Sequence, residues 1–162
     1  MANITLDTKL FGSLTFDPDE DFSLTCSPML DGRRRNLDLD MDAGLVTGAG
    51  TDRVLAALDD MDRLYRTARA ALLQRYNAYD PEVISYLEER VLVIDEEGNF
   101  PEVESPLSFL LERLVPVSIF LFYDDIDDTV LVVLRFCPGA GWDDKLLSVS
   151  LLGDDEPDVY RI

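Results

Sequence analysis

The spacing of apolar residues divides the chain into three regions, and the pattern in the first region is typical of strands. From residue 2 to residue 42, apolar and polar positions tend to alternate, with turn-forming groups at DPDED (17–21) and at Asp31-Gly32. The clearest case is RNLDLDMD (35–42), in which three apolar residues on one face alternate with Asp38, Asp40 and Asp42 on the other. A period of two with that contrast is typical of a half-buried strand.

The second region, from residue 51 to residue 114, has apolar residues at steps of three and four, which indicates helices. The first predicted helix has Thr51 or Asp52 as its N-cap and continues to about residue 77. On its polar side, Asp59 precedes Arg63 by four residues, a spacing that supports a helix through an ion pair.

Two further helices are predicted from cap-then-proline signatures. In YDPEVISYLEER (79–90), Asp80 caps and Pro81 occupies the first helical position. Ser105-Pro106 repeats the signature and predicts a short helix over LSFLLERL.

The third region returns to strands. PVSIFLFY (116–123) and TVLVVLRF (129–136) are nearly continuous apolar runs joined by DDIDD (124–128), which predicts a hairpin buried on both faces at the centre of a sheet. KLLSVSLL (145–152) predicts another strand, and we expect the acidic tail 153–162 to fray. The sequence therefore predicts one α+β domain over 1–162, with an antiparallel sheet of about six strands and the helical middle segment packed on one face.

Composition adds a strong electrostatic character to this fold. The 162 residues are 47% hydrophobic and carry a formal net charge of −19, which indicates a folded but strongly acidic domain. Such a charge disfavours nucleic acid and membrane surfaces as partners, and it steers basic proteins toward the surface. The alternative is that the acidity serves solubility alone.

Several kinds of chemistry are excluded or disfavoured by what the chain lacks. Histidine is absent, which excludes Ser-His-Asp and Cys-His nucleophile arrangements and every zinc site that requires imidazole. Cys26 and Cys137 have no metal-binding or redox spacing, and we expect buried free thiols. The start of the chain does not resemble a secretory signal, and no apolar run approaches the roughly 20 residues that span a bilayer. We therefore expect a cytoplasmic protein without membrane contact.

The aspartates of 38–42 and the glycines after them were tested against known loops. Neither Asp38 nor Asp40 starts a frame with the glycine and glutamate that an EF-hand requires. The P-loop lysine is missing, and Arg53 stands where a dinucleotide-binding loop requires its last glycine. This segment is therefore interpreted as a strand that leads through a glycine-containing connection into a helix.

The acidic hairpin tip is the main candidate for function. Asp124, Asp125, Asp127 and Asp128 cluster there, either as a solvated tip, as a protein-binding element, or as a metal site. Trp142, in a glycine-containing loop, is either an exposed interface anchor or a side chain that holds the loop on the core. A further group of acidic candidates lies on the first helix: Asp59, Asp60 and Asp62.

The order of several short segments resembles a known family. FGSLTFD (11–17), DGRRRNLDLDM (31–41), YDPEVISYLEE (79–89), FYDD and LVVLRF are similar to segments of an uncharacterised bacterial domain-of-unknown-function family. The resemblance implies a small cytosolic protein, and some members are similar to immunity proteins that accompany secreted toxins. It implies no catalytic residues.

These observations lead to one main functional hypothesis and two alternatives. The main hypothesis is a non-enzymatic, cofactor-free inhibitor that occludes the basic cleft of a bacterial toxin acting on nucleic acid. Its contact residues would be the four tip aspartates, Asp38, Asp40 and Asp42, with Trp142 as apolar anchor. The alternatives are a carboxylate-based or divalent-metal-dependent enzyme that uses the same aspartates, and a non-catalytic regulatory subunit.

Overall fold

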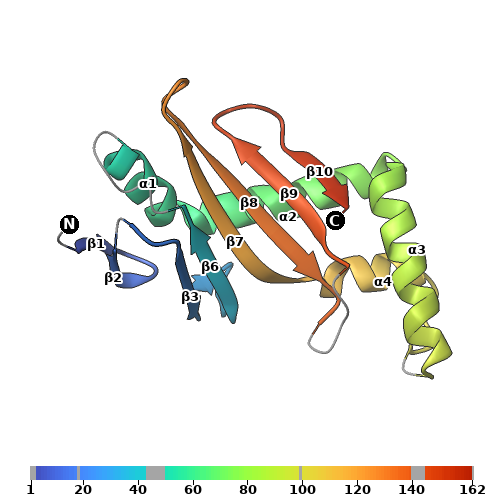
Figure 1. Ribbon diagram of the computed structural model, residues 1–162. Coiled ribbons are helices and arrows are strands. Elements are labelled where there is room, and N and C mark those ends of the chain that lie inside the picture. The colour runs from blue at the N-terminus through green and yellow to red at the C-terminus, as the bar shows by residue number, and fades with distance from the viewer. Residues whose placement is uncertain (1–2, 18, 43–49, 99, 140–144, 162) are drawn as a thin grey trace.

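The computed structural model describes residues 3–17, 19–42, 50–98, 100–139 and 145–161 and shows an α+β fold (Figure 1). In these ranges the helices are α1 (Gly50–Asp59), α2 (Met61–Asn77), α3 (Pro81–Glu96) and α4 (Pro106–Arg113). The strands in the same ranges are β1 (Ile4–Thr8), β2 (Gly12–Phe16), β3 (Phe22–Cys26), β4 (Met29–Leu30), β5 (Arg33–Arg34), β6 (Leu37–Met41), β7 (Val115–Asp124), β8 (Thr129–Cys137), β9 (Leu147–Leu152) and β10 (Asp158–Arg161).

Six of the described strands form one sheet in the order β10-β9-β8-β7-β6-β3, with the predicted β7–β8 hairpin at its centre. Neighbouring strands are antiparallel except for β6 and β7, which are parallel. The sequence predicted an antiparallel sheet, and this pair makes it mixed. The reason is that all four helices lie between β6 and β7 in the chain, so the connection crosses over and β7 starts from the same end as β6.

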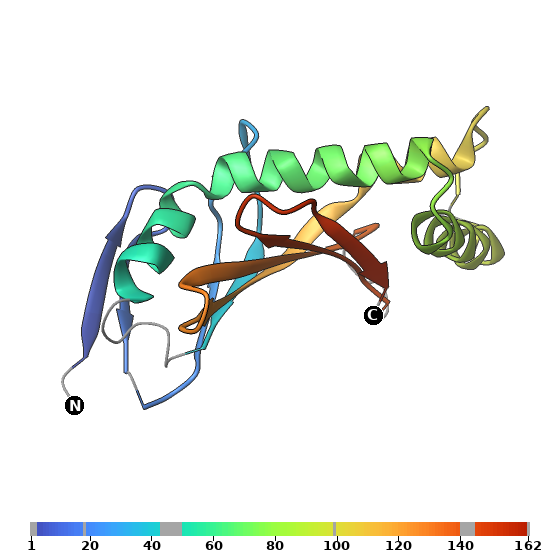
Figure 2. The same cartoon turned by 90° about the horizontal axis from the view of Figure 1, so that it is seen from above.

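One face of the sheet carries the core. A row of buried residues crosses five strands, because Leu39, Ile119, Leu134, Val149 and Val159 are direct neighbours in the register. The apolar stripes of α1 and α2 pack onto this face, and Figure 2 shows α2 lying along it. The predicted packing of the helical segment on one face is therefore confirmed.

The opposite face of the sheet is only partly covered. The hairpin strands were predicted to be buried on both faces, but Phe122 on β7 is 40% exposed and Leu152 on β9 is 39% exposed. Among the described elements, no helix packs over this face (Figures 1 and 2). Val133 on β8 is still 5% exposed, because neighbouring side chains of the same face surround it.

The predicted first helix is divided in two. α1 ends at Asp59 and α2 begins at Met61, and Figure 2 shows the change of direction between them. The Oδ1 atom of Asp59 accepts a hydrogen bond from the backbone N–H of Lys9, which connects the bend to the turn after β1. The predicted caps Thr51 and Asp52 lie inside the first turn, because α1 already begins at Gly50.

The two helix starts predicted from a cap followed by proline are confirmed, whereas the predicted fraying of the C-terminal tail is wrong. The Asp80 carboxylate accepts a hydrogen bond from the N–H of Glu82 with Pro81 at the first helical position, and α4 begins at Pro106 as predicted. The tail instead forms β10, the edge strand beside β9. Its Val159 is 4% exposed, so burial in the core holds the strand in place.

Two small hairpins stand outside the main sheet, namely β1–β2 and β4–β5. The second is closed by Asp31 and Gly32, whose φ angles of 51° and 74° form the two-residue turn that the sequence predicted.

Both cysteines are free thiols, with Cys137 buried and Cys26 half-buried. Burial, and then the nearby Asp38 carboxylate, raises the pKa of Cys26 to about 11. Within the described ranges, no helix is long and apolar enough to cross a membrane.

Candidate functional site

The acidic hairpin tip is an ordered extension of the two central strands. The β7–β8 ladder continues to the pair Asp124–Thr129, so a four-residue turn, 125–128, closes the hairpin. Within it, the backbone N–H of Ile126 donates to Oδ1 of Asp124 at 2.9 Å, and Asp128 adopts a positive φ of 51°. We call residues Asp124–Asp128 the finger. Figure 1 shows it projecting beyond the body of the sheet.

Asp128 links the finger to another element of the molecule. The Oδ2 atom of Asp128 accepts from Nη2 of Arg53 on α1 at 2.9 Å, and its Oδ1 atom accepts from the hydroxyl of Tyr123 at 2.6 Å. The hydrogen bond from Tyr123, followed by the one from Arg53, lowers the pKa of Asp128. The same hydrogen bond raises the pKa of Tyr123. Asp128 therefore fixes the finger to α1, and the other three aspartates form its acidic surface.

The apex of the finger is apolar. Ile126 is 90% exposed, the largest exposed fraction among the large hydrophobic residues of the described chain. The sequence of DDIDD predicts an acidic tip, and the predicted apolar anchor, Trp142, lies outside the described residues. The signal for Ile126 was present, since a single apolar residue between two pairs of aspartates has no core to enter.

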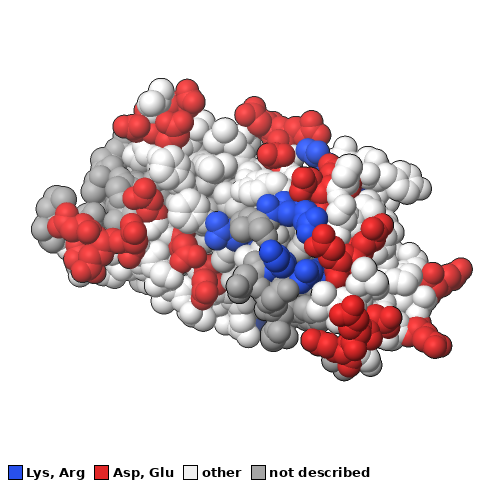
Figure 3. Space-filling view, turned by 45° about the vertical axis from the view of Figure 1, so that its right-hand side comes forward, with Lys and Arg blue, Asp and Glu red and all other residues white. Residues whose placement is uncertain are grey.

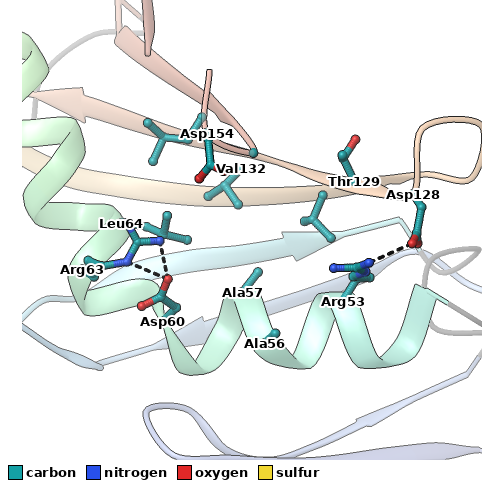
Figure 4. Close-up of a pocket in the computed structure, with 13 residues that line it drawn as sticks. Arg53, Ala56, Ala57, Asp60, Arg63, Leu64, Asp128, Thr129, Val132 and Asp154 are labelled. Carbon is teal, nitrogen blue, oxygen red and sulfur yellow. Dashed lines mark hydrogen bonds and ion pairs between the residues drawn. The ribbon is translucent and has the colours of Figure 1, made fainter. Parts of the chain in front are cut away.

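A pocket of about 300 Å³ lies at the base of the finger (Figure 4). The ion pair between Arg53 and Asp128 borders it on one side, and the pair between Arg63 and Asp60 borders it on the other. Asp154, from the turn between β9 and β10, lies on the rim. The apolar lining comes from both helices and the sheet: Ala56, Ala57, Leu64, Val130, Val132 and Leu151.

The parallel pairing of β6 with β7 brings a second predicted group toward the finger. Met41 pairs with Leu121, and the N–H of Asp42 donates to the carbonyl of Leu121 at 3.5 Å. Asp40 and Asp42 line a shallow pocket of about 340 Å³ on the partly covered face of the sheet. These two aspartates therefore lie toward the finger end of β7.

Asp38 and the helix aspartates are placed differently. Asp38 pairs with Ser118, farther from the finger, and accepts a hydrogen bond from the hydroxyl of Thr25 at 2.8 Å. Asp62 accepts from the backbone N–H of Asp31 at 2.6 Å and pairs with Arg66. Asp60, not Asp59 as the i,i+4 spacing predicted, is the partner of Arg63, because the bend between the helices brings it closer.

Charge is unevenly distributed over the surface. Figure 3 shows acidic side chains in several separate groups on one face of the molecule, with basic side chains gathered near its middle. In the part of the chain that the structure describes, no three Asp, Glu, Cys or His side chains converge in a way that could hold a metal ion.

Comparisons with known proteins add no family to this description. No protein-family model matches the chain, and neither a curated protein nor a solved structure matches it. The resemblance to an immunity-protein-like family stays a prediction from the short motifs.

Proposed function

We propose that this protein is an acidic protein-binding domain that acts as an immunity-type inhibitor of a basic toxin directed at nucleic acid. The observation that carries the proposal is the finger, in which an exposed isoleucine lies between carboxylates at the end of the central hairpin. In a nuclease-like cleft, carboxylates would occupy the positions of substrate phosphates, and the apolar apex would enter a pocket between them.

The finger suits this role because its shape is fixed before it binds. The β7–β8 pairs that lead to the finger, the turn hydrogen bond of Asp124 and the two bonds to Asp128 stabilise the conformation of the loop. A segment that is already ordered loses little conformational entropy on association, so more of its contact energy is retained as affinity.

The neighbouring turn extends the acidic surface. Asp154, Asp155 and Glu156 lie in the turn between β9 and β10, and all three are exposed. Figure 1 shows this turn and the finger projecting from the same end of the sheet. Because the whole chain has a net charge of −19, this acidic end of the molecule would attract a basic partner over long range.

The proposal is tested with a finger variant and a matched control of equal charge change. The finger variant replaces Asp124, Asp125 and Asp127 by Asn, and the control replaces Glu97, Glu102 and Glu104, which are exposed and distant in the chain, by Gln. A partner is captured from lysate of the native host on the immobilised wild-type protein, purified, and its binding kinetics are measured.

We expect the finger variant to slow association about tenfold or more and to flatten its dependence on salt, whereas the control variant changes both only slightly. Replacing Ile126 by Ser should instead accelerate dissociation, because the apolar anchor is lost. An association rate equally affected by both acid variants would remove the finger from the proposal. An acidic partner, or tight magnesium binding abolished by the finger substitutions, would contradict it and favour the carboxylate-based enzyme.

A further inference from the structure

Arginine side chains gather around a second pocket, on the helix side of the molecule and away from the finger. This pocket has a volume of about 480 Å³ and lies between the β4–β5 hairpin, α2 and the end of α4. Figure 2 shows the β4–β5 hairpin beside α2. Six of its lining residues are charged, and four of these are arginines: Arg33, Arg35, Arg69, Arg113, Asp31 and Glu112.

Three of these arginines contact an aromatic ring as well as backbone carbonyls, and one of them is Arg69, whose guanidinium lies 5.9 Å from the centroid of the Phe136 ring. The guanidinium of Arg35 lies over the ring of Tyr65, 5.4 Å from its centroid, and its Nε contacts the carbonyl of Leu30 at 3.4 Å. The guanidinium of Arg113 lies 3.4 Å from the centroid of the Phe109 ring and donates to the Phe109 carbonyl at 3.1 Å. None of these contacts neutralises the charge of the arginine.

Arg69 connects the pocket to the end of α4. Its Nη1 donates to the carbonyl of Leu114 at 2.6 Å, and its Nη2 donates to the carbonyl of Glu112 at 3.1 Å. Arg33, on β5, is exposed and also lines the pocket. Backbone carbonyls therefore help to position the guanidinium groups of Arg35, Arg69 and Arg113.

Among the described residues, carboxylates do not form ion pairs with these four arginines, although the chain has 33 acidic and only 14 basic residues. Within the described residues, no carboxylate oxygen lies within 4.0 Å of their guanidinium nitrogens, whereas six other arginines do form ion pairs: Arg53, Arg63, Arg66, Arg75, Arg90 and Arg161. Four arginines and two acids give the pocket a formal charge of +2 in a protein of −19. Four guanidinium groups gathered with only two carboxylates repel one another, and a bound anion reduces that cost.

We propose that this arginine pocket binds a small molecule bearing phosphate groups, such as a phosphate monoester or a diphosphate. Guanidinium groups form bidentate hydrogen bonds with phosphate oxygens, and several of them match the multiple charges of a phosphorylated ligand. The volume of the pocket accommodates more than one phosphate. This inference is independent of the finger and of the partner proposed for it.

The test compares two adjacent arginines, of which one lines the pocket and the other does not. Arg33 lines the pocket, whereas Arg34 follows it on β5, is not among the lining residues, and donates from Nη1 to the carbonyl of Ser27. Binding of inorganic pyrophosphate to the wild-type protein, to Arg33→Gln and to Arg34→Gln is measured by isothermal titration calorimetry at low ionic strength. Citrate, a carboxylate of comparable charge, is titrated in parallel.

We expect pyrophosphate to bind the wild-type protein with submillimolar affinity, Arg33→Gln to weaken it about tenfold, and Arg34→Gln to weaken it less than twofold. Arg113→Gln provides a second pocket variant with the same expected loss, and circular dichroism verifies that each variant is folded. Absence of pyrophosphate binding would overturn the proposal, and so would equal losses in the Arg33 and Arg34 variants. Tighter binding of citrate than of pyrophosphate would assign the pocket to carboxylates and overturn the phosphate assignment.

Discussion

The Asp128 carboxylate receives a hydrogen bond at each of its two oxygens, which distinguishes it from the other aspartates of the finger. Tyr123 and Arg53 both stabilise the ionised form, and this is why the pKa of Asp128 is lowered. In the sequence the four aspartates of DDIDD are equivalent. The separate role of Asp128 depends on Arg53, 75 residues away in the chain.

Replacing Tyr123 by Phe should raise the pKa of Asp128 toward its ordinary value, because the first cause of its depression is removed. A depressed pKa adds stability that is present above the unfolded-state value of about 3.9 and is lost as the pH falls through the folded-state value. The variant should therefore lose less stability than the wild type between neutral and acidic pH. Carbon-13 NMR titration of the Asp128 carboxyl measures the change directly.

The matched control for this titration is Tyr160→Phe, which removes a tyrosine hydroxyl that contacts Ser150 on the sheet and not the finger. We expect it to leave the Asp128 titration unchanged. An unaltered Asp128 titration in Tyr123→Phe, or an equal shift in both variants, would show that the hydroxyl of Tyr123 does not govern the carboxylate.

At the scale of elements, α2 ends in a turn that places a tyrosine in a left-handed conformation. Tyr79 has a φ of 56°, and its N–H donates to the carbonyl of Tyr76, while that of Asp80 donates to the carbonyl of Arg75. This position at a helix C-terminus favours glycine, because a side chain with a Cβ atom is strained there. Tyr79 is 82% exposed, so its ring contributes little packing in return.

Tyr79→Gly should therefore increase the free energy of unfolding by about 0.5–1 kcal/mol, which is the relief of strain less the added freedom of glycine in the unfolded chain. Ala78→Gly is the control, since Ala78 has an ordinary φ of −87° and gains only the unfolded-state freedom. We expect this control to be destabilised by about 0.5–1 kcal/mol. Urea denaturation of both variants measures the difference, and a loss of stability in Tyr79→Gly would show that the exposed ring contributes more than the strain costs.

Local patterns predicted the elements of this fold better than their arrangement. The alternation in 35–42 and the cap at Asp80 are determined by neighbouring residues, and β6 and α3 form where they were expected. The parallel β6–β7 pair, the bend at Asp60 and the edge strand β10 depend on contacts between residues far apart in the chain. Short-range periodicity contains no information about such contacts.

The same distinction applies to the candidate sites. The acidic finger was predicted because its aspartates are contiguous in the sequence. The arginine pocket was not, although RRR (33–35) is visible in the sequence, because Arg69 and Arg113 join it only through the packing of α2 and α4 beside the β4–β5 hairpin.

At the scale of the whole molecule, negative charge should oppose folding. A net charge of −19 on a chain of 162 residues repels itself more strongly in the compact state than in the unfolded one. The unpaired arginines gathered in one pocket offset little of this repulsion at the finger end. The excess negative charge therefore destabilises the folded state, and its benefit lies in function or in solubility.

Sodium chloride should consequently stabilise the protein, because raising the ionic strength from 0.01 M to 0.1 M shortens the screening length from about 30 Å to about 10 Å. We expect the melting temperature to rise steadily over this range and up to 0.5 M, by about 2–4 °C for each kcal/mol of repulsion removed. The variant with Glu97, Glu102 and Glu104 replaced by Gln, which lowers the net charge from −19 to −16, should melt higher at low salt and respond less to added salt. Differential scanning calorimetry measures both effects, with sucrose of equal osmolality as a non-ionic control. If the melting temperature fell with salt, or if sucrose produced the same increase, ion pairs or solvent exclusion would govern stability in place of net charge.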